Sequence, residues 1–157
     1  MKNPKSPKSE KPKLLFLCTG NSCRSQMAEG FGKKLMGDRW DIYSAGVAPS
    51  FVHPLAVSVM NEAGVDISRH YSKGLDEIPF SELTQIITLC GHADETCPAI
   101  PSHAVKEHWP IEDPFRTQGR EEVVWKKFRE VRDEIRNRIE EFSRREAPGA
   151  LSRRASQ

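Results

Sequence analysis

Hydrophobic residues recur along the first half of the chain in short runs that alternate with helical repeats. Residues 13–17 form an apolar run of the length of a buried strand, and residues 25–36 follow with helical spacing and strong helix formers. A second strand is predicted over residues 40–45 and a second helix over residues 53–63, each followed by a glycine. The first half therefore alternates strand, helix, strand and helix.

The second half continues the alternation less regularly. Strands are predicted over residues 84–89 and 104–108, and a long helix over residues 119–142. The apolar positions of this helix recur at helical spacing, with Arg and Glu on the other face. They are Val124, Phe128, Val131, Ile135, Ile139 and Phe142. Strands that alternate with helices predict an α/β fold, a three-layer sandwich in which helices cover both faces of a four-stranded parallel sheet.

Length and composition limit the chain to one domain. It has 157 residues, of which 37% are apolar, which is enough for a single core. Both ends are rich in basic residues, so we expect disordered tails over residues 1–12 and 144–157 around a domain at residues 13–143. Neither tail carries aromatic residues that could stack on bases, so binding to nucleic acid is not favoured.

The only apolar run behind the basic N-terminus is too short for a signal peptide or a membrane span. We therefore expect a cytoplasmic protein that does not act at a membrane. In that reducing compartment, the chain's 4 cysteines are more often catalytic, metal-binding or redox-active than structural bridges.

The segment from Cys18 to Arg24, called the anion loop below, links the first predicted strand to the first predicted helix. Such a connection directs several N–H groups into one space, where the helix dipole also favours negative charge. These donors and Arg24 favour the thiolate of Cys18, and the planar guanidinium can bind two oxygens of one ligand. The loop therefore predicts a site where Cys18 attacks a tetrahedral oxyanion. The alternative is a buried cysteine with an unrelated arginine beyond it.

A second cysteine pair, Cys90 and Cys97, follows the third predicted strand. If the intervening segment is helical, the two Cα atoms lie roughly 10 Å apart, whereas a disulfide needs them within about 7 Å. Three interpretations stay open. The thiols are unrelated and buried, or they bind zinc although their spacing is not that of zinc knuckles, or they form a relay. In the relay, Cys90 attacks a sulfur on Cys18 and Cys97 then attacks Cys90.

In a parallel sheet, ligands bind beyond the carboxyl ends of the strands. Cys18, Cys90 and the loop that carries Asp113 each follow a predicted strand. We therefore expect these three positions to converge at one edge of the sheet, although they are far apart in sequence.

Four motifs that occur in order resemble those of the thioredoxin-coupled arsenate reductases, whose fold is that of the low-molecular-weight protein tyrosine phosphatases. The likeness spans about residues 13–143 and omits both tails. The motifs are residues 18–30, residues 43–46, residues 88–90 with Cys97-Pro98, and residues 106–109 with Asp113-Pro114.

The resemblance implies a reaction that begins at Cys18, which would attack arsenate and form a thiol–arsenate adduct. Ser25 would hydrogen-bond the thiolate, and Asp113 would protonate the departing oxygen. The oxyanion would be bound by Thr19, Gly20, Asn21, Ser22, Cys23 and Arg24. Asn21 would also brace the loop, and Cys23 would pack without a catalytic step.

The resemblance further implies that Cys90 displaces arsenite by attacking Cys18, and that Cys97 then forms a disulfide with Cys90. Thioredoxin would reduce that disulfide, so neither a metal nor a bound organic cofactor is required. A monomer is the default expectation for the oligomeric state.

One position departs from part of the family. Some members bind a monovalent cation with oxygen ligands that map to Asn21, Glu29, Ser44 and an acid near position 73. This chain has Lys73, whose ammonium would repel a cation and pair with Glu29 instead. We therefore expect no requirement for potassium.

Two other functions compete with arsenate reduction. A tyrosine phosphatase of the same fold would use Cys18, Arg24 and Asp113, but it has no use for Cys90 and Cys97. A redox or anion sensor without turnover would need no proton donor such as Asp113, although Asp-Pro is also a common turn signal.

Overall fold

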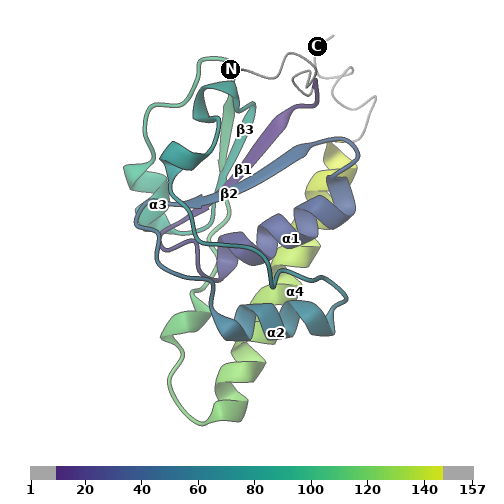
Figure 1. The fold of residues 1–157 in the computed structure, drawn as a ribbon, viewed down its shortest axis with the longest axis vertical. Helices are drawn as coiled ribbons and strands as arrows, with labels where there is room; N and C mark the ends of the chain where they lie inside the picture. The colour runs from purple at the N-terminus through teal and green to yellow at the C-terminus, as the bar shows by residue number, and fades with distance from the viewer. Residues whose placement is uncertain (1–9, 147–157) are drawn as a thin grey trace.

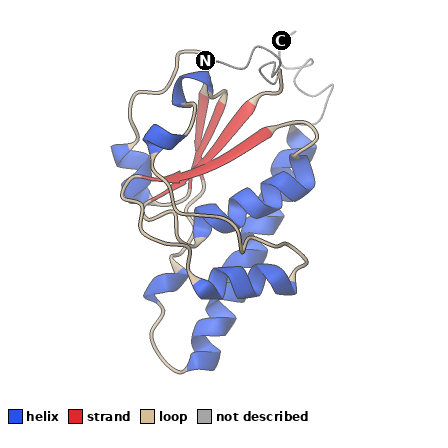
Figure 2. Cartoon of the chain, in the orientation of Figure 1, coloured by secondary structure: helices blue, strands red, loops and turns tan. Residues whose placement is uncertain are grey.

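A four-stranded parallel sheet forms the centre of the computed structural model, which describes residues 10–146 (Figures 1 and 2). Its strands are β1 (Lys13–Cys18), β2 (Asp41–Gly46), β3 (Gln85–Thr88) and β4 (Val105–His108). The spatial order β2-β1-β3-β4 places β1 between β2 and β3, and every pairing is parallel. The predicted strands and the predicted parallel sheet are confirmed.

Helices cover the two faces of this sheet (Figure 1). They are α1 (Arg24–Met36), α2 (Pro54–Glu62), α3 (Gly91–Thr96) and α4 (Glu121–Arg145). Helices α1, α2 and α4 lie on one side, and α3 lies on the other together with short 3₁₀ turns at Leu75–Glu77 and Phe80–Glu82. The three-layer sandwich expected from the sequence is therefore confirmed.

The side chains of β1 supply the cores on both faces. Leu14 and Phe16 pack into the cluster under α1 and α4, whereas Leu15 and Leu17 pack into the cluster on the α3 side. Successive side chains of a strand point to opposite faces, so a fully apolar strand fits only where both faces are covered. This explains why the run that precedes the anion loop has no polar position after Lys13.

The long helix α4 buries the apolar stripe that its sequence predicts. Phe128, Val131, Ile135, Ile139 and Phe142 are all buried, while Val124 is half-buried. Burying a side chain of this size stabilises a fold by about 1.5–3 kcal/mol. The stripe therefore anchors α4 against α1 and α2 along its length.

The bounds of the long helix differ from expectation. Helix α4 runs over Glu121–Arg145, whereas the sequence predicted residues 119–142. At its end Arg145 pairs with Glu107 of β4, and the Glu146 N–H bonds to the Phe142 carbonyl. Helix α3 and the 3₁₀ turns were not predicted as separate elements. Residues 1–9 and 147–157, which hold most of the two expected tails, lie outside the described residues.

Gly46, the last residue of β2, lies against the backbone of the anion loop. A Cβ at this position would meet the Thr19 carbonyl oxygen at 2.6 Å and the Asn21 nitrogen at 2.7 Å. Since backbone atoms cannot give way as a flexible side chain can, only glycine fits here.

Replacing Gly46 with alanine should therefore destabilise the protein by about 1–3 kcal/mol, through overpacking against the loop. Urea unfolding would measure the change. Gly91→Ala is the matched control, because a Cβ there has nothing within 4 Å and alanine favours the helix. Equal midpoints for the Gly46 variant and the natural protein would contradict the prediction.

Candidate active site

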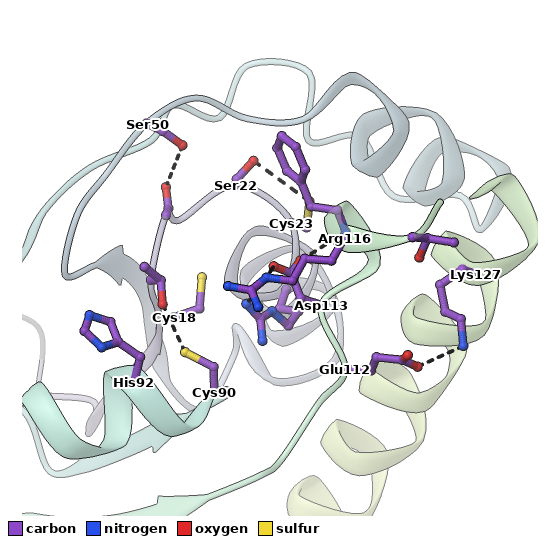
Figure 3. Close-up of a pocket in the computed structure, with 15 residues that line it drawn as sticks. Cys18, Ser22, Cys23, Ser50, Cys90, His92, Glu112, Asp113, Arg116 and Lys127 are labelled. Atoms are coloured by element: carbon purple, nitrogen blue, oxygen red, sulfur yellow. Dashed lines mark hydrogen bonds and ion pairs between the residues drawn. The ribbon is translucent and has the colours of Figure 1, made fainter. Parts of the chain in front are cut away.

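The anion loop connects the end of β1 to the first turn of α1, as the sequence predicts. Cys18 is the last residue of β1 and Arg24 is the first residue of α1. Both are nearly buried, with 2% and 8% of their surface exposed. The loop lines a cavity of about 660 Å³, and Figure 3 shows the Cys18 sulfur directed into it. The nucleophile and the cation thus face one space.

Residues 47–53 run alongside the anion loop and hold its carbonyl groups from outside. The hydrogen bonds run from Val47 N to Cys18 O (3.1 Å), Ala48 N to Thr19 O (2.8 Å), Ser50 N to Gly20 O (3.1 Å) and His53 N to Ser22 O (3.1 Å). In a trans peptide the N–H points away from the C=O, and no cis peptide occurs among the described residues. The N–H groups of the same peptides are therefore directed toward the cavity, where they can bind an oxyanion.

Asn21 braces the loop at its sharpest turn. Its φ of 49° lies in the left-handed region, which asparagine tolerates better than most residues. Its side-chain oxygen accepts hydrogen bonds from the Lys73 backbone N–H (2.9 Å) and from Gln26 Nε2 (2.8 Å). These bonds hold the strained turn, which is the structural function expected of Asn21.

Ser25 connects Asn21 to the nucleophile. Its hydroxyl oxygen accepts a hydrogen bond from Asn21 Nδ2 (2.8 Å) and lies 2.8 Å from the Cys18 sulfur. Because Asn21 already supplies a proton to the Ser25 oxygen, the hydroxyl proton is free to point at the sulfur. The Ser25 hydroxyl is therefore placed to donate a hydrogen bond to the Cys18 sulfur.

Asp113 lies at the opposite side of the cavity, at the start of the 3₁₀ turn Pro114–Arg116. Its Oδ1 accepts a hydrogen bond from the Phe115 N–H (3.0 Å), and its Oδ2 lies 3.5 Å from Arg24 Nη2. Arg24 also donates through Nη1 to the Ile111 carbonyl (3.0 Å). The guanidinium therefore connects the anion loop to the segment that carries the candidate acid.

Cys90 reaches the same cavity from the neighbouring strand. The register of β1 and β3 pairs Leu17 with Thr88, so the ends of these strands lie together. The Cys90 sulfur lies 3.3 Å from Thr19 Oγ1 of the anion loop and accepts a hydrogen bond from the Ala93 N–H at 3.3 Å. The expected convergence of Cys18, Cys90 and Asp113 is confirmed, since all three line the cavity (Figure 3).

Cys97 lies outside this cavity, at the far end of α3. It is half-buried in the cluster with Ile100 and Ala93, and burial raises the pKa of its thiol. The segment from Cys90 to Cys97 is helical and all four cysteines are free thiols, so the structure describes the fully reduced protein. At ~1.5 Å per residue, the Cys90 and Cys97 Cα atoms are too far apart for a disulfide in this form.

Cys23 behaves as a packing residue. It has 3% of its surface exposed, and burial raises the pKa of its thiol to about 12. A thiol that stays protonated is a poor nucleophile. This agrees with the expectation that Cys23 takes no catalytic step.

Comparison with known proteins places the chain among characterised relatives. The family model for low molecular weight phosphotyrosine protein phosphatases matches residues 13–153. The chain belongs to this family. An arsenate reductase of Halalkalibacterium halodurans is 51% identical over 130 residues, which is 83% of this chain and 94% of the relative.

Solved structures of arsenate reductases have the same fold. One, described in its phosphate-binding state, superimposes with a TM-score of 0.71 at 33% identity over 87% of this chain and 99% of the other. A thioredoxin-dependent arsenate reductase of Corynebacterium glutamicum gives a TM-score of 0.69 at 28% identity, over 95% of this chain and 65% of the other.

Lys73 occupies the position at which the resemblance to the arsenate reductases implies a cation-binding acid in some relatives. Its Nζ lies 3.1 Å from Glu29 Oε1 and donates to Ser44 Oγ at 3.2 Å, while the Ser44 hydroxyl donates to the same Glu29 oxygen. Only 8% of Lys73 and 4% of Glu29 are exposed. The ammonium thus neutralises the buried carboxylate, and these residues do not fit an additional cation. The expected Lys73–Glu29 pair is confirmed.

The groups around Glu29 lower the pKa of its carboxyl group. Burial disfavours the carboxylate, but hydrogen bonds from Lys33 and Ser44 and the charge of Lys73 outweigh it and lower the pKa of Glu29. The ionised pairing therefore stabilises the fold above the unfolded pKa of Glu, ~4.3, and its contribution is lost as pH falls through the lowered value.

His53 does not line the cavity, but it contacts residues that do, and sequence reasoning missed it. Besides its backbone bond to the anion loop, its Nδ1 accepts a hydrogen bond from the Leu55 N–H (3.0 Å), which caps α2. Its ring packs against Phe115 beside Asp113 and against Phe128 of α4, with centroids 4.8 and 4.9 Å apart. Burial lowers the pKa of His53 despite the nearby Asp113. A His-Pro pair at a helix start indicates a cap, but no sequence signal indicates the ring contacts.

Between residues 10 and 146, no group of His, Cys, Asp and Glu side chains is arranged to hold a metal ion. None of the helices in this range combines the length and apolar character that a membrane crossing needs.

Replacing Lys73 with methionine should destabilise the protein by about 3 kcal/mol, because it leaves the buried Glu29 carboxylate without its buried counter-charge. Lys33→Met is the control. Lys33 bonds the same carboxylate, but 52% of its side chain is exposed. Lys33→Met should therefore lower the free energy of unfolding by less than about 1 kcal/mol.

Thermal melting in potassium or sodium chloride at equal ionic strength extends the test. Potassium should stabilise the Lys73 variant selectively, because it can replace the lost ammonium, and should not do so for the natural protein. A potassium-specific rise in the melting temperature of the natural protein would contradict the assignment.

Proposed function

We propose that this protein is an arsenate reductase that uses Cys18, Cys90 and Cys97 as a thiol relay and is regenerated by thioredoxin. The observation that carries the proposal is the position of Cys90. Its sulfur lies against Thr19 of the anion loop, so a second thiol lines the cavity that holds the nucleophile. The name of the H. halodurans relative supports the substrate, and that of the C. glutamicum structure supports the reductant.

The first step is an attack of the Cys18 thiolate on arsenic. The loop N–H groups and Arg24 bind the arsenate oxygens and stabilise the charge that accumulates on them. A sulfur–arsenic bond forms while one arsenic–oxygen bond breaks, and Asp113 supplies a proton so that the oxygen leaves as water. In this structure Arg24 contacts Asp113, and a bound anion would compete with Asp113 for the guanidinium.

The second step uses Cys90 in place of water. Its thiolate attacks the Cys18 sulfur, a disulfide forms, and the electron pair of the broken sulfur–arsenic bond reduces arsenic(V) to arsenic(III), which leaves as arsenite. Cys97 then attacks Cys90 and releases the Cys18 thiolate. Thioredoxin returns the Cys90–Cys97 disulfide to two thiols, so the electrons pass through cysteines and no bound cofactor is invoked.

This chemistry requires a reducing compartment. We place the activity in the cytoplasm, where thioredoxin keeps thiols reduced, and in a monomer, because every proposed group comes from one chain. The biological consequence is detoxification of arsenic, since arsenite is the product released.

The rival function is phosphoester hydrolysis, which the family name itself favours. Cys18, Arg24 and Asp113 would suffice for a phosphocysteine intermediate, and phosphate and arsenate are both tetrahedral oxyanions. Hydrolysis needs no second thiol, so it would not account for Cys90 at the cavity. We therefore expect at most a weak side activity on aryl phosphates.

The natural protein should oxidise NADPH in the presence of arsenate, thioredoxin and thioredoxin reductase. Omission of arsenate or thioredoxin should abolish the signal, and so should Cys18→Ser. If NADPH is not consumed while an aryl phosphate is hydrolysed, the protein is a phosphatase. Absence of both activities would support a sensor.

The relay order predicts a trapped intermediate. Cys97→Ser should complete a single turnover and accumulate a disulfide between Cys18 and Cys90, because the last thiol is missing. Peptide mass spectrometry after arsenate treatment would detect that bond. Cys23→Ser is the control and should turn over repeatedly, since Cys23 takes no step in the relay. Arsenite release without a Cys18–Cys90 bond would show that the order is wrong.

A further inference from the structure

The segment between Cys90 and Cys97 is tied to the sheet by one side chain in its middle, Asp94. Its Oδ1 accepts a hydrogen bond from Thr88 Oγ1 of β3 (2.9 Å) and lies 3.2 Å from Lys106 Nζ of β4. Lys106 also donates to the Asp94 backbone carbonyl at 2.7 Å. Thus both the side chain and the backbone of Asp94 are held by strands on which α3 rests.

The anchor points lie on rigid elements. Thr88 is fully buried within β3, and His108 Nδ1 lies 2.8 Å from its hydroxyl oxygen, which orients the group that donates to Asp94. The bond from Thr88, together with Lys106, lowers the pKa of Asp94, so the residue is an anion at neutral pH. A partly exposed ion pair such as Asp94–Lys106 alone contributes little to stability, because solvent screens it. The hydrogen bond from the buried Thr88 hydroxyl is less exposed to that screening.

These contacts conflict with the geometry of the oxidised state. Bringing the Cys90 and Cys97 Cα atoms from roughly 10 Å to within about 7 Å requires α3 to unwind. Asp94 lies in the middle of the segment, so its backbone is displaced when the ends converge. The bonds to Thr88 and Lys106 therefore belong to the helical dithiol form.

We propose that Asp94 is a positioning residue that holds the Cys90–Cys97 segment in its helical dithiol form and thereby sets how readily the disulfide forms. Its contacts stabilise the reduced state only, so they make the pair harder to oxidise and, once oxidised, a better acceptor of electrons from thioredoxin. This inference rests on the proposed thiol relay, because the relay is what requires the Cys90–Cys97 segment to change between its dithiol and disulfide forms.

The adjacent Glu95 provides a matched control within the same helix. It carries the same charge but is exposed, and its side chain forms no hydrogen bond or ion pair with residues 10–146. Comparing Asp94→Asn with Glu95→Gln therefore removes one negative charge from α3 in each case. Only the first change weakens the contacts with the sheet.

The experiment equilibrates full-length Cys18→Ser protein with mixtures of reduced and oxidised dithiothreitol. The Cys18 change restricts exchange to the Cys90–Cys97 pair. Two protein thiols lose two protons and two electrons to the dithiothreitol disulfide, and alkylation followed by peptide mass spectrometry measures the fraction bonded. Asp94→Asn should increase the equilibrium constant for disulfide formation about tenfold, which corresponds to about 30 mV toward a more negative potential. Glu95→Gln should change it less than twofold.

Melting temperatures of the two redox forms separate this effect from a general structural one. Asp94→Asn should lower the melting temperature of the reduced form and leave that of the oxidised form unchanged. Equal losses in both forms, an unchanged equilibrium constant, or failure of the parent protein to form a Cys90–Cys97 disulfide would each overturn the inference.

Arsenate-dependent NADPH oxidation by the natural protein is measured in parallel. If the natural protein turns over arsenate but Asp94→Asn leaves the equilibrium constant for the Cys90–Cys97 disulfide unchanged, only the assignment of Asp94 is overturned. A tenfold shift without arsenate turnover supports the assignment of Asp94 and overturns the proposed reductase function alone.

Discussion

The hydrogen bonds between residues 47–53 and the carbonyls of the anion loop are the constraint on which the site depends. By holding the C=O groups outside, they direct the N–H groups of the same peptides inward, so a neutral backbone becomes a binding site for an anion. Asn21 holds the strained turn, and the same side chain orients Ser25 toward Cys18. One asparagine therefore contributes both to the shape of the loop and to the position of the Ser25 hydroxyl beside Cys18.

The buried Lys73–Glu29 pair behind the loop neutralises a carboxylate that the fold buries. Glu29 lies under the loop in a place where an unpaired carboxylate would be costly. The Lys73 ammonium neutralises it from within the chain and also bonds Ser44, while the Lys73 backbone N–H bonds Asn21. A side chain that is covalently part of the protein can supply this positive charge in place of an ion from solution.

The three cysteines of the proposed relay differ because their surroundings impose different constraints. Cys18 is fixed by a rigid loop, and Cys90 lies at a strand end where it contacts that loop. Cys97 is separated from both by α3, which Asp94 holds against β3 and β4. Rigidity at the anion site favours binding and attack, whereas a segment held by a few contacts can change shape when a disulfide forms.

The sequence by itself determined the order of the strands and of α1, α2 and α4, and the anion loop, because these follow from periodicity and local turn chemistry. The pairing of Lys73 with Glu29 was implied by the family resemblance. Only the tertiary structure decided that residues 47–53 orient the loop, that His53 contacts Phe115, and that Asp94 joins α3 to the sheet. These contacts join residues on different elements through single hydrogen bonds or ring edges, which leave no periodic pattern. Their existence depends on the register and packing of the sheet, which the whole chain sets together.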